Sequence, residues 1–448
     1  MLRFFDVSVL ASASMGPAYS LAATMGPMVA TAGAAAPVAL LAVSAIMLCV
    51  AIAFAQLSRV APNAGSSYSW IRMAFGGRIG AYGAWLLLLS NFFATMATAV
   101  PAGIYTLDLL APRYAQNPLA DAGVGAIWIL GSAVLLYVGI RPTALVTAIA
   151  LAIELSVLAA SAIVAALSPH HAVIAHAPQS AHVSLFALTF FGFVNAMTLG
   201  IWMSDGWEVS ASAAEEVRDD ARASGRGGVT GLIATTVVLC LCMIGYLHLG
   251  SVAGFSENQD DSMRYVGDLL GGGAWRFAIV ATVLVSTCSA LWTTILYLSR
   301  SVYAMGRDGL LPPALGKLDA RDEPLASLAA VAVLAAAFEL ATGFSPTAAD
   351  ALQTVLNASS IFLGLLFALS AAAAIRTFLR KRESRLAGVV IPAIGLVALA
   401  LVLTATILLE DRVLQYYAAG GVVLGIPFAL WRGGRRLAPA GELPGGYE

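Results

Sequence analysis

The amino-acid sequence predicts an all-α polytopic membrane protein with twelve transmembrane helices. Hydrophobic residues make up 60% of the 448-residue chain, and charged residues only 11%. Twelve apolar stretches reach the length of about 20 residues that a helix needs to cross roughly 30 Å of hydrocarbon. The basic residues collect almost entirely in alternate gaps between these stretches, as expected when successive loops lie on opposite sides of a membrane.

The predicted spans begin, in chain order, near Val7, Val38, Tyr82, Val124, Thr143, Leu185, Val229, Trp275, Leu325, Ala348, Gly388 and Val413. Several contain Gly or Pro, which membrane helices tolerate better than soluble ones. With the amino terminus inside, only four of the 24 Lys and Arg residues fall in external gaps: Arg113, Arg264, Arg276 and Arg412. The positive-inside rule therefore predicts a multi-pass protein of a bacterial-type plasma (inner) membrane, with both termini in the cytoplasm.

The remaining composition argues against several classes of function. A net charge of −1 without a basic tract gives no reason to expect nucleic-acid binding. There is no Walker motif for ATP use, and the short loops hold no appended catalytic domain, so we do not predict an enzyme. No metal or cofactor site is predicted, because the cysteines lie inside spans and the histidines of one external loop lack zinc-ligand spacing. These residues are Cys49, Cys240, Cys242 and Cys288, and His170, His171, His176 and His182.

The chain divides into two similar halves and an addition. Residues 1–167 hold five predicted spans and residues 184–376 hold five more, while residues 387–431 add two and residues 432–448 form a cytoplasmic tail. Because five is an odd number, the second block enters from the opposite side of the membrane. The two blocks are then related by a pseudo-two-fold axis in the membrane plane, the inverted repeat of many secondary transporters.

Each half opens with an interrupted span. In the first span Met15-Gly16-Pro17-Ala18 breaks the helix, and Gly26-Pro27 forms a second interruption; in the sixth, Ser204-Asp205-Gly206 lies within an apolar run. Proline removes a backbone donor, and unwound backbone at membrane depth is stable only where it lines a cavity or is buried in protein. The interruptions therefore point to a binding site between the halves. Two kinks without a ligand are the alternative.

Asp205, Glu208 and Glu154 are the carboxylates predicted to lie deepest in the membrane. Inserting such a group costs roughly 2.5–3.5 kcal/mol, so it usually faces the bundle interior and handles an ion or a substrate. Asp205 and Glu208 follow the sixth-span break, and Glu154 lies near the middle of the fifth span. The alternatives are structural: a helix cap for Asp205, a hydrogen bond that braces the break for Glu208, and a satisfied polar contact for Glu154.

Two tryptophans flank the sixth-span break. Trp202 and Trp207 can gate a cavity or hold an ammonium group by a cation–π attraction worth about 2 kcal/mol when desolvated. Asn91 in the third span and Thr294 in the eighth could line the same pore. Ordinary packing of the tryptophans and helix–helix hydrogen bonds of the two polar residues are the alternatives.

Four motifs, in the same order along the chain, resemble the amino acid–polyamine–organocation permease superfamily over about residues 6–385. Met15–Tyr19 stands at the position of that family's Gly-x-Gly break, and Pro62–Gly76 resembles its P-x-x-G-G-x-Y-x-W…FG pattern. Trp202–Asp219 resembles an aromatic-rich break that leads to E-E-V-x-(N/D)-P. Ser299–Pro312 is similar to SR-x-x-Y-A-M-x-R-D-G-x-x-P.

The resemblance implies a five-plus-five inverted repeat with two added helices, and alternating access between spans one, three, six, eight and ten. It also implies that the backbone around both breaks contacts substrate, and that Glu208 matches an acidic position which meets an amine in polyamine carriers. Some proton-coupled relatives carry a lysine at the position of Glu154. The predicted substrate-binding residues are Gly16, Pro17, Ala18, Tyr19, Asn91, Trp202, Asp205, Gly206 and Glu208, with Glu154 and Glu208 as candidates for proton coupling.

One departure from the family pattern bears on the substrate. A Gly-x-Gly loop presents N–H groups to a substrate carboxylate. Here Pro17 supplies no N–H and Ala18 replaces a glycine, while Asp205 adds a negative charge beside the site. These changes favour an amine-rich or cationic substrate over a neutral amino acid.

The predicted function is a secondary-active permease that takes up amino acids, polyamines or related amines, with protons as the coupling ion. The alternatives are a neutral amino-acid symporter, an exchanger, sodium coupling through Ser286, Thr287 and Ser289, a membrane enzyme, and a non-transporting receptor or scaffold. The expected partners are the small-molecule substrate and the lipid bilayer. The sequence does not predict an oligomeric state.

Overall fold

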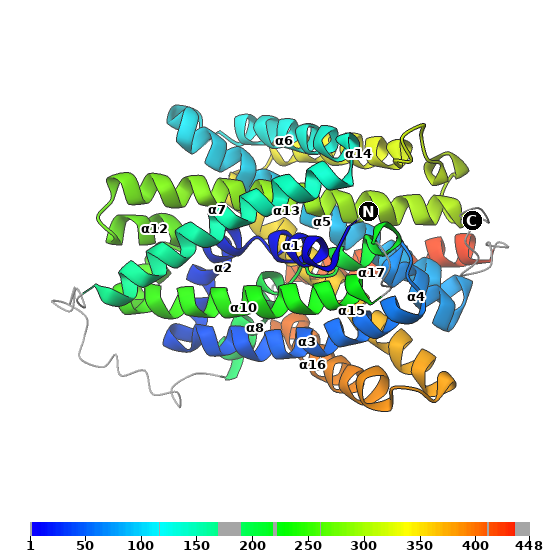
Figure 1. The fold of residues 1–448 in the computed structure, drawn as a ribbon. Coiled ribbons are helices and arrows are strands. Elements are labelled where there is room, and N and C mark those ends of the chain that lie inside the picture. The colour runs from blue at the N-terminus through cyan, green and yellow to red at the C-terminus, as the bar shows by residue number, and fades with distance from the viewer. Residues whose placement is uncertain are drawn as a thin grey trace.

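The computed structural model describes residues 2–115, 117–168, 190–217, 222–259, 261–409 and 412–434. Within these residues the chain is helical, and its one extended pairing is an isolated bridge between Leu2 and Val217. Figure 1 shows the long helices running side by side as one bundle. The predicted all-α class is confirmed. The histidines of the predicted external loop, together with Arg218 and Asp219, lie outside the described residues.

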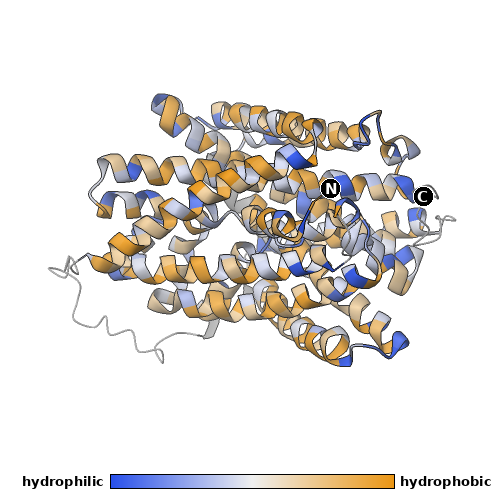
Figure 2. Cartoon of the chain, viewed as in Figure 1, coloured by the Kyte–Doolittle hydropathy of each residue, from blue (hydrophilic) through white to orange (hydrophobic). Residues whose placement is uncertain are grey.

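In the described part of the chain, nine helical stretches are long and apolar enough to cross a membrane. The first, Phe4–Val60, contains two of the predicted spans, and there are two shorter apolar helices, Gly192–Met203 and Ala418–Gly433. Figure 2 shows apolar residues along the lengths of the helices and hydrophilic residues mostly near their ends. The protein is therefore a multi-pass membrane protein, as the sequence predicts.

The first half of the chain contains seven α-helices: α1 (Phe4–Ser14), α2 (Pro17–Ala32), α3 (Ala36–Val60), α4 (Ser66–Phe75), α5 (Gly77–Leu110), α6 (Pro118–Val138) and α7 (Ile140–Leu167). The second contains α8 (Phe190–Met203), α9 (Val209–Ser212), α10 (Ala223–Leu249), α11 (Val252–Glu257), α12 (Ser262–Leu269), α13 (Gly273–Arg307), α14 (Leu325–Thr342) and α15 (Ala348–Lys381). Two more, α16 (Ile391–Leu409) and α17 (Arg412–Gly433), complete the bundle.

Helices α5 and α13 form the centre of the bundle. In their most apolar windows 72% and 83% of the residues are buried, against 33% in α7. Helix α13 packs against α5, α6, α7 and α14, and α15 packs along α5. Side chains that α5 and α13 direct inward are therefore shielded from lipid, which makes these helices suited to carry polar groups.

The first helix breaks at the predicted position. Gly16 has a left-handed φ of 52° between α1 and α2, a conformation that costs a residue with a Cβ more than it costs glycine. Pro17 then begins α2, where its missing N–H is not needed. The second predicted interruption is wrong: α2 continues through Gly26 and Pro27 to Ala32. A proline can stay inside a membrane helix when the surrounding protein shields the backbone that it disturbs.

The sixth-span break is also present, and it touches the first. Helix α8 ends at Met203 and α9 begins only at Val209, with Gly206 at φ 100° between them. A Cβ placed on Gly206 would lie 2.7 Å from the carbonyl carbon and oxygen of Ser14 and 2.9 Å from the nitrogen of Met15. The backbones of the two breaks therefore pack directly on each other, and only glycine fits at this contact.

We predict that Gly206→Ala separates the two breaks and lowers the yield and the thermal stability of the purified protein. The added methyl group meets backbone, and alanine also disfavours the positive φ. Gly131→Ala is the matched control, because Gly131 lies in α6 and a Cβ there meets no atom within 4 Å. The measurement is the unfolding temperature of both variants in the same detergent. Equal stability of the two variants would contradict the contact.

Candidate functional site

A central cavity lies where the two breaks meet. It is lined by residues from α1, α2, α5, α8, α9 and α13 and from the α1–α2 and α8–α9 connections. Six predicted site residues are among them: Tyr19, Asn91, Trp202, Asp205, Gly206 and Glu208. The others are Ser14, Met15, Ser20, Ala94, Thr98, Val209, Ala290, Thr294 and Tyr297.

Gly16, Pro17 and Ala18 are not part of this lining. They lie behind it, because Pro17 and Ala18 form the buried first turn of α2. Met15 belongs to the predicted first-span break, and Ser14 directly precedes it. Thr98, Ala290 and Tyr297 carry no local signal, since they lie in long helices whose inward faces become visible only in the bundle.

The cavity is acidic. Among the described residues that line it, Asp205 and Glu208 carry carboxyl groups and none is basic. Glu208 accepts a hydrogen bond of 3.0 Å from the backbone N–H of Gly206, so it does brace the break. Asp205 does not cap the restarting helix, because α9 has no side-chain cap. Its Oδ1 is buried and has no hydrogen-bond partner among the described residues.

Glu154 reaches the site from α7 and binds the amino-terminal turn of α2. Its Oε1 accepts hydrogen bonds from the N–H of Ala18 at 2.7 Å and from the hydroxyl of Ser286 at 2.5 Å. The N–H of Tyr19 donates to Ser286 Oγ at 3.1 Å. The N–H of Ser20 donates to the carbonyl of Gly16 at 2.7 Å. Because Pro17 has no N–H, every donor of this helix terminus is already engaged.

A proline in α5 gives Tyr19 its position. Pro101 lies inside α5 and cannot donate to the carbonyl four residues earlier, that of Ala97. The hydroxyl of Tyr19 donates to this carbonyl oxygen at 2.5 Å. The phenol therefore bridges α2 and α5 at the cavity wall and satisfies a buried acceptor that the helix leaves open.

The two tryptophans differ in position. Trp202 lines the central cavity and also a second, mostly apolar cavity between α2, α8, α15 and α16, so it forms the wall between them. Trp207 is 1% exposed and packs between Phe54 and Phe367, with ring centroids 4.9 and 5.4 Å away. Trp207 is thus a core residue, while Trp202 separates the two cavities.

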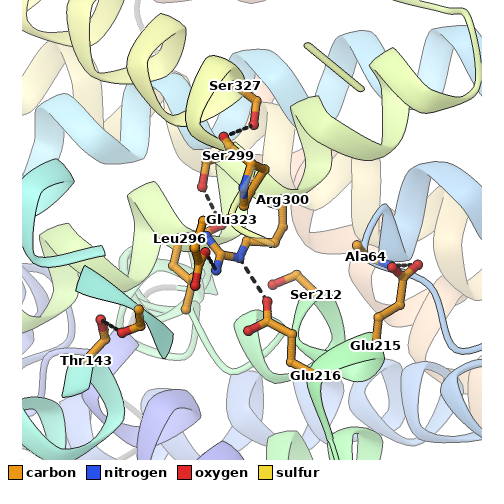
Figure 3. A network of polar contacts seen from close by, with 12 residues as sticks. Ala64, Thr143, Ser212, Glu215, Glu216, Leu296, Ser299, Arg300, Glu323 and Ser327 are labelled. Carbon is orange, nitrogen blue, oxygen red and sulfur yellow. Dashed lines mark hydrogen bonds and ion pairs between the residues drawn. The ribbon is translucent and has the colours of Figure 1, made fainter. Parts of the chain in front are cut away.

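Away from the cavity, seven charged residues form what we call the ionic latch: Arg72, Glu215, Glu216, Arg300, Arg307, Asp308 and Glu323. Figure 3 shows Arg300 between Glu216 and Glu323, and Glu215 beside the backbone of Ala64. Arg300 contacts Glu216 Oε1 at 3.0 Å and Glu323 Oε2 at 2.9 Å. Arg307 binds both carboxylate oxygens of Glu215, at 2.8 and 3.1 Å.

The latch joins segments that are distant in the sequence. Glu215 Oε1 also accepts from the N–H of Ala64 at 3.0 Å, and Arg72 pairs with Asp308 at 2.5 Å. Glu323 follows α13 in the loop before α14; burial raises its pKa, and the charge of Arg300 opposes this shift. The latch therefore ties the α3–α4 connection, the end of the α8–α9 segment and the end of α13 into one unit.

No group of three or more His, Cys, Asp or Glu residues that could hold a metal ion occurs in the described ranges. The four cysteines are free thiols.

One protein-family model matches nearly the whole chain. The family model described as "Amino acid permease" matches residues 2–428. The chain belongs to this family. It is 27% identical over 311 residues to a branched-chain amino acid permease of Lactococcus lactis, covering 64% of this chain and 65% of that protein, so the match spans just under two thirds of that relative.

Two further relatives of this chain carry different names. An uncharacterized transporter of Mycobacterium tuberculosis is 28% identical over 415 residues, covering 89% of this chain and 83% of the relative. A vacuolar cationic amino acid transporter 4 of Arabidopsis thaliana is 26% identical over 302 residues, covering 63% and 49%. The permease family is therefore established, while its described relatives differ in substrate.

We predict that reversing one charge of the latch lowers the thermal stability of the protein, and that reversing both charges of one ion pair restores this stability in part. Arg307→Glu places two carboxylates together, whereas Arg307→Glu with Glu215→Arg restores an ion pair of opposite orientation. Loss of such a partly exposed pair costs about 1 kcal/mol, visible as a lower unfolding temperature. The exposed pair of Arg276 and Asp268, 3.5 Å apart, is the control. The prediction fails if the double swap is no more stable than Arg307→Glu.

Proposed function

We propose that this permease is a secondary-active transporter of cationic amines and cationic amino acids, which it moves across a plasma membrane by alternating access. The observation that carries this proposal is the lining of the central cavity, where Asp205 and Glu208 meet no basic side chain of the residues that the structure describes. Such a cavity attracts an ammonium group, and Trp202 in its wall can add a cation–π contact. The substrate would thus supply the missing positive charge.

The engaged terminus of α2 supports the same substrate class. A helix amino terminus binds anions through its free N–H groups, but here Glu154, Ser286 and Gly16 accept from all of them. A substrate carboxylate would have to displace Glu154 and face the carboxyl groups of Asp205 and Glu208. An amine avoids both costs.

The proposed topology is twelve crossings, with residues 1–167 and 184–376 as inverted repeats, residues 387–431 as two added helices, and residues 432–448 as a tail. Two observations support it: the interrupted helices are the first of each half, and their breaks touch at the cavity. A common cytoplasmic face for the termini is supported by the bridge of Leu2 to Val217. Gly433 of α17 also packs against Gly77 and Arg78, next to the latch residue Arg72.

Glu154 is the proposed site of proton coupling. It lies on α7, is fully buried, and joins α2 and α13 through Ala18 and Ser286. Its Oε2 has no partner among the described residues, so this oxygen can take a proton without breaking the contacts of Oε1. Protonation would weaken the hydrogen bonds that Oε1 accepts from Ala18 and Ser286. Binding of the proton would therefore affect the position of α2. Sodium is the less favoured ion, since Ser286 is engaged by Glu154.

A neutral amino-acid symporter is the second candidate. The observation in its favour is that two relatives, from Lactococcus lactis and Bacillus subtilis, are named branched-chain amino acid permeases. An amine or amino-acid exchanger would use the same cavity without a proton. A receptor or scaffold that does not transport is a more distant alternative.

We expect purified protein to bind putrescine and arginine in preference to leucine and alanine. Asp205→Asn should weaken amine binding at least tenfold, or about 1.4 kcal/mol, because it removes a charge that faces the ligand. Asp268→Asn, an exposed acid on α12, is the control and should bind normally. Isothermal titration of all four ligands measures this. Tight binding of leucine or alanine, with no binding of putrescine or arginine, would exclude the proposed substrate class.

We expect Glu154→Gln to keep substrate binding and exchange but to lose uptake driven by an inward proton gradient. The glutamine oxygen can still accept from Ala18, so α2 stays in place, but the amide does not titrate. Radiolabelled putrescine uptake into proteoliposomes, with a proton gradient, a sodium gradient or neither, measures this. Uptake by the wild type that ignores both gradients and requires internal substrate would indicate an exchanger and return Glu154 to a structural role.

A further inference from the structure

A second pair of carboxyl groups is buried outside the central cavity, between α6 and α14. Asp121 lies in the first turn of α6, and Glu339 lies in the last turn of α14. Their exposed fractions are 1% and 0%. Neither residue lines the central cavity or belongs to the ionic latch, so transport as proposed above leaves both unexplained.

All four oxygens of this pair lack a hydrogen-bond donor among the described residues. Among the described residues, Asp121 is the one charged group that acts on Glu339. The following titratable groups of the neighbouring helices are engaged elsewhere. On α5, Asp108 contacts Arg264 and Tyr105 contacts Asp261. On α7, Glu154 binds the first turn of α2. On α13, Arg276 contacts Asp268, Tyr297 contacts Ser66, and both Arg300 and Arg307 belong to the latch.

A glycine of α6, one turn after Asp121, lets Glu339 lie close to the backbone. A Cβ on Gly125 of α6 would collide with Glu339 Oε1, and it would lie 2.8 Å from the carbonyl oxygen of Ala99 in α5. The carboxyl group of Glu339 therefore lies against the α6 backbone, beside a helix carbonyl. The carboxyl oxygens of Glu339 thus lie beside another acceptor and have no donor among the described residues, an arrangement that is costly if both carboxyl groups are ionised.

We propose that Asp121 and Glu339 form a proton-binding site, separate from Glu154, that holds α6 against α14 when protonated and loosens them when the proton leaves. The bound proton supplies the missing donor: one carboxyl O–H donates to the other carboxyl group or to the Ala99 carbonyl. Release to water leaves a carboxylate anion with no counter-charge in the space described, which favours separation of the two helices. This inference goes beyond the proposed transport and does not depend on which substrate is carried.

The site lies at one end of a helix whose other end is held by the latch. Helix α14 begins at Leu325, two residues after the latch residue Glu323, and Glu339 lies about 21 Å along it. Proton occupancy at one end of α14 can therefore act, through a rigid helix, on the segment that Arg300 fixes at the other. This gives the permease a means of sensing pH on the side opposite the latch.

The test is infrared spectroscopy of the protein in lipid, in the carbonyl region of protonated carboxyl groups. At neutral pH the band should lose intensity in Asp121→Asn and in Glu339→Gln, but not in Glu257→Gln, which alters an exposed acid on α11. The unfolding temperature of the wild type should fall by several degrees between about pH 6 and about pH 9, because deprotonation disfavours the packed state. Asp121→Asn should reduce that fall, since its amide is a permanent donor.

Two results would overturn the proposal. In the first, the carbonyl band is the same in the wild type and both variants. In the second, sodium or calcium raises the unfolding temperature of the wild type but not of Asp121→Asn, which would make this a metal-cation site. If Asp121→Asn does not fold, Asp121→Glu keeps the carboxyl group and should retain the band. Both readouts are independent of transport, so failure of the proposed function leaves them interpretable.

Discussion

The contact of Glu154 with the first turn of α2 is the interaction on which the rest of the site depends. A helix broken inside a membrane exposes N–H groups that water cannot satisfy. Glu154 and Ser286 satisfy two of them, at Ala18 and Tyr19, and Gly206 seats the second break directly on the first. Fixing α2 in this way also removes the anion site that a free helix terminus would offer. The stability of the break and the loss of an anion site at the helix terminus thus have a common origin.

The motifs that resemble the family contribute residues both to the latch and to the cavity. Glu215, Arg300 and Asp308 belong to the sequence motifs, and the structure gathers them in the latch, away from the cavity. Two of the motifs reach the cavity, whose lining includes Met15 and Tyr19 of the first break and Trp202, Asp205, Gly206 and Glu208 of the second. Most of the remaining lining comes from α5 and α13 and lies outside the motifs. The latch and the cavity are thus separate regions of one fold.

How far the sequence predicts the molecule depends on whether the signal is local. Apolar stretches predict the helical membrane class, and Gly16 and Gly206 mark the breaks because they take a positive φ. Gly26-Pro27 misleads, because shielding by neighbouring helices decides whether a proline interrupts. The partner of Glu154 is 136 residues away, and Trp207 is a core residue only because Phe54 and Phe367 surround it. Asp121 and Glu339 pass unnoticed, since an acid near a helix end resembles a solvated one until the bundle buries it.

In the proposed bound state an amine occupies the acidic cavity, while Glu154 stays hydrogen-bonded to the amino-terminal turn of α2. The most direct measurement is an experimental structure of the permease with putrescine or arginine bound. We predict a ligand nitrogen within about 3 Å of Oδ1 of Asp205, with Glu154 still accepting a hydrogen bond from the N–H of Ala18. A bound amino acid whose carboxylate replaces Glu154 at Ala18 and Tyr19, with its ammonium group away from Asp205, would contradict it.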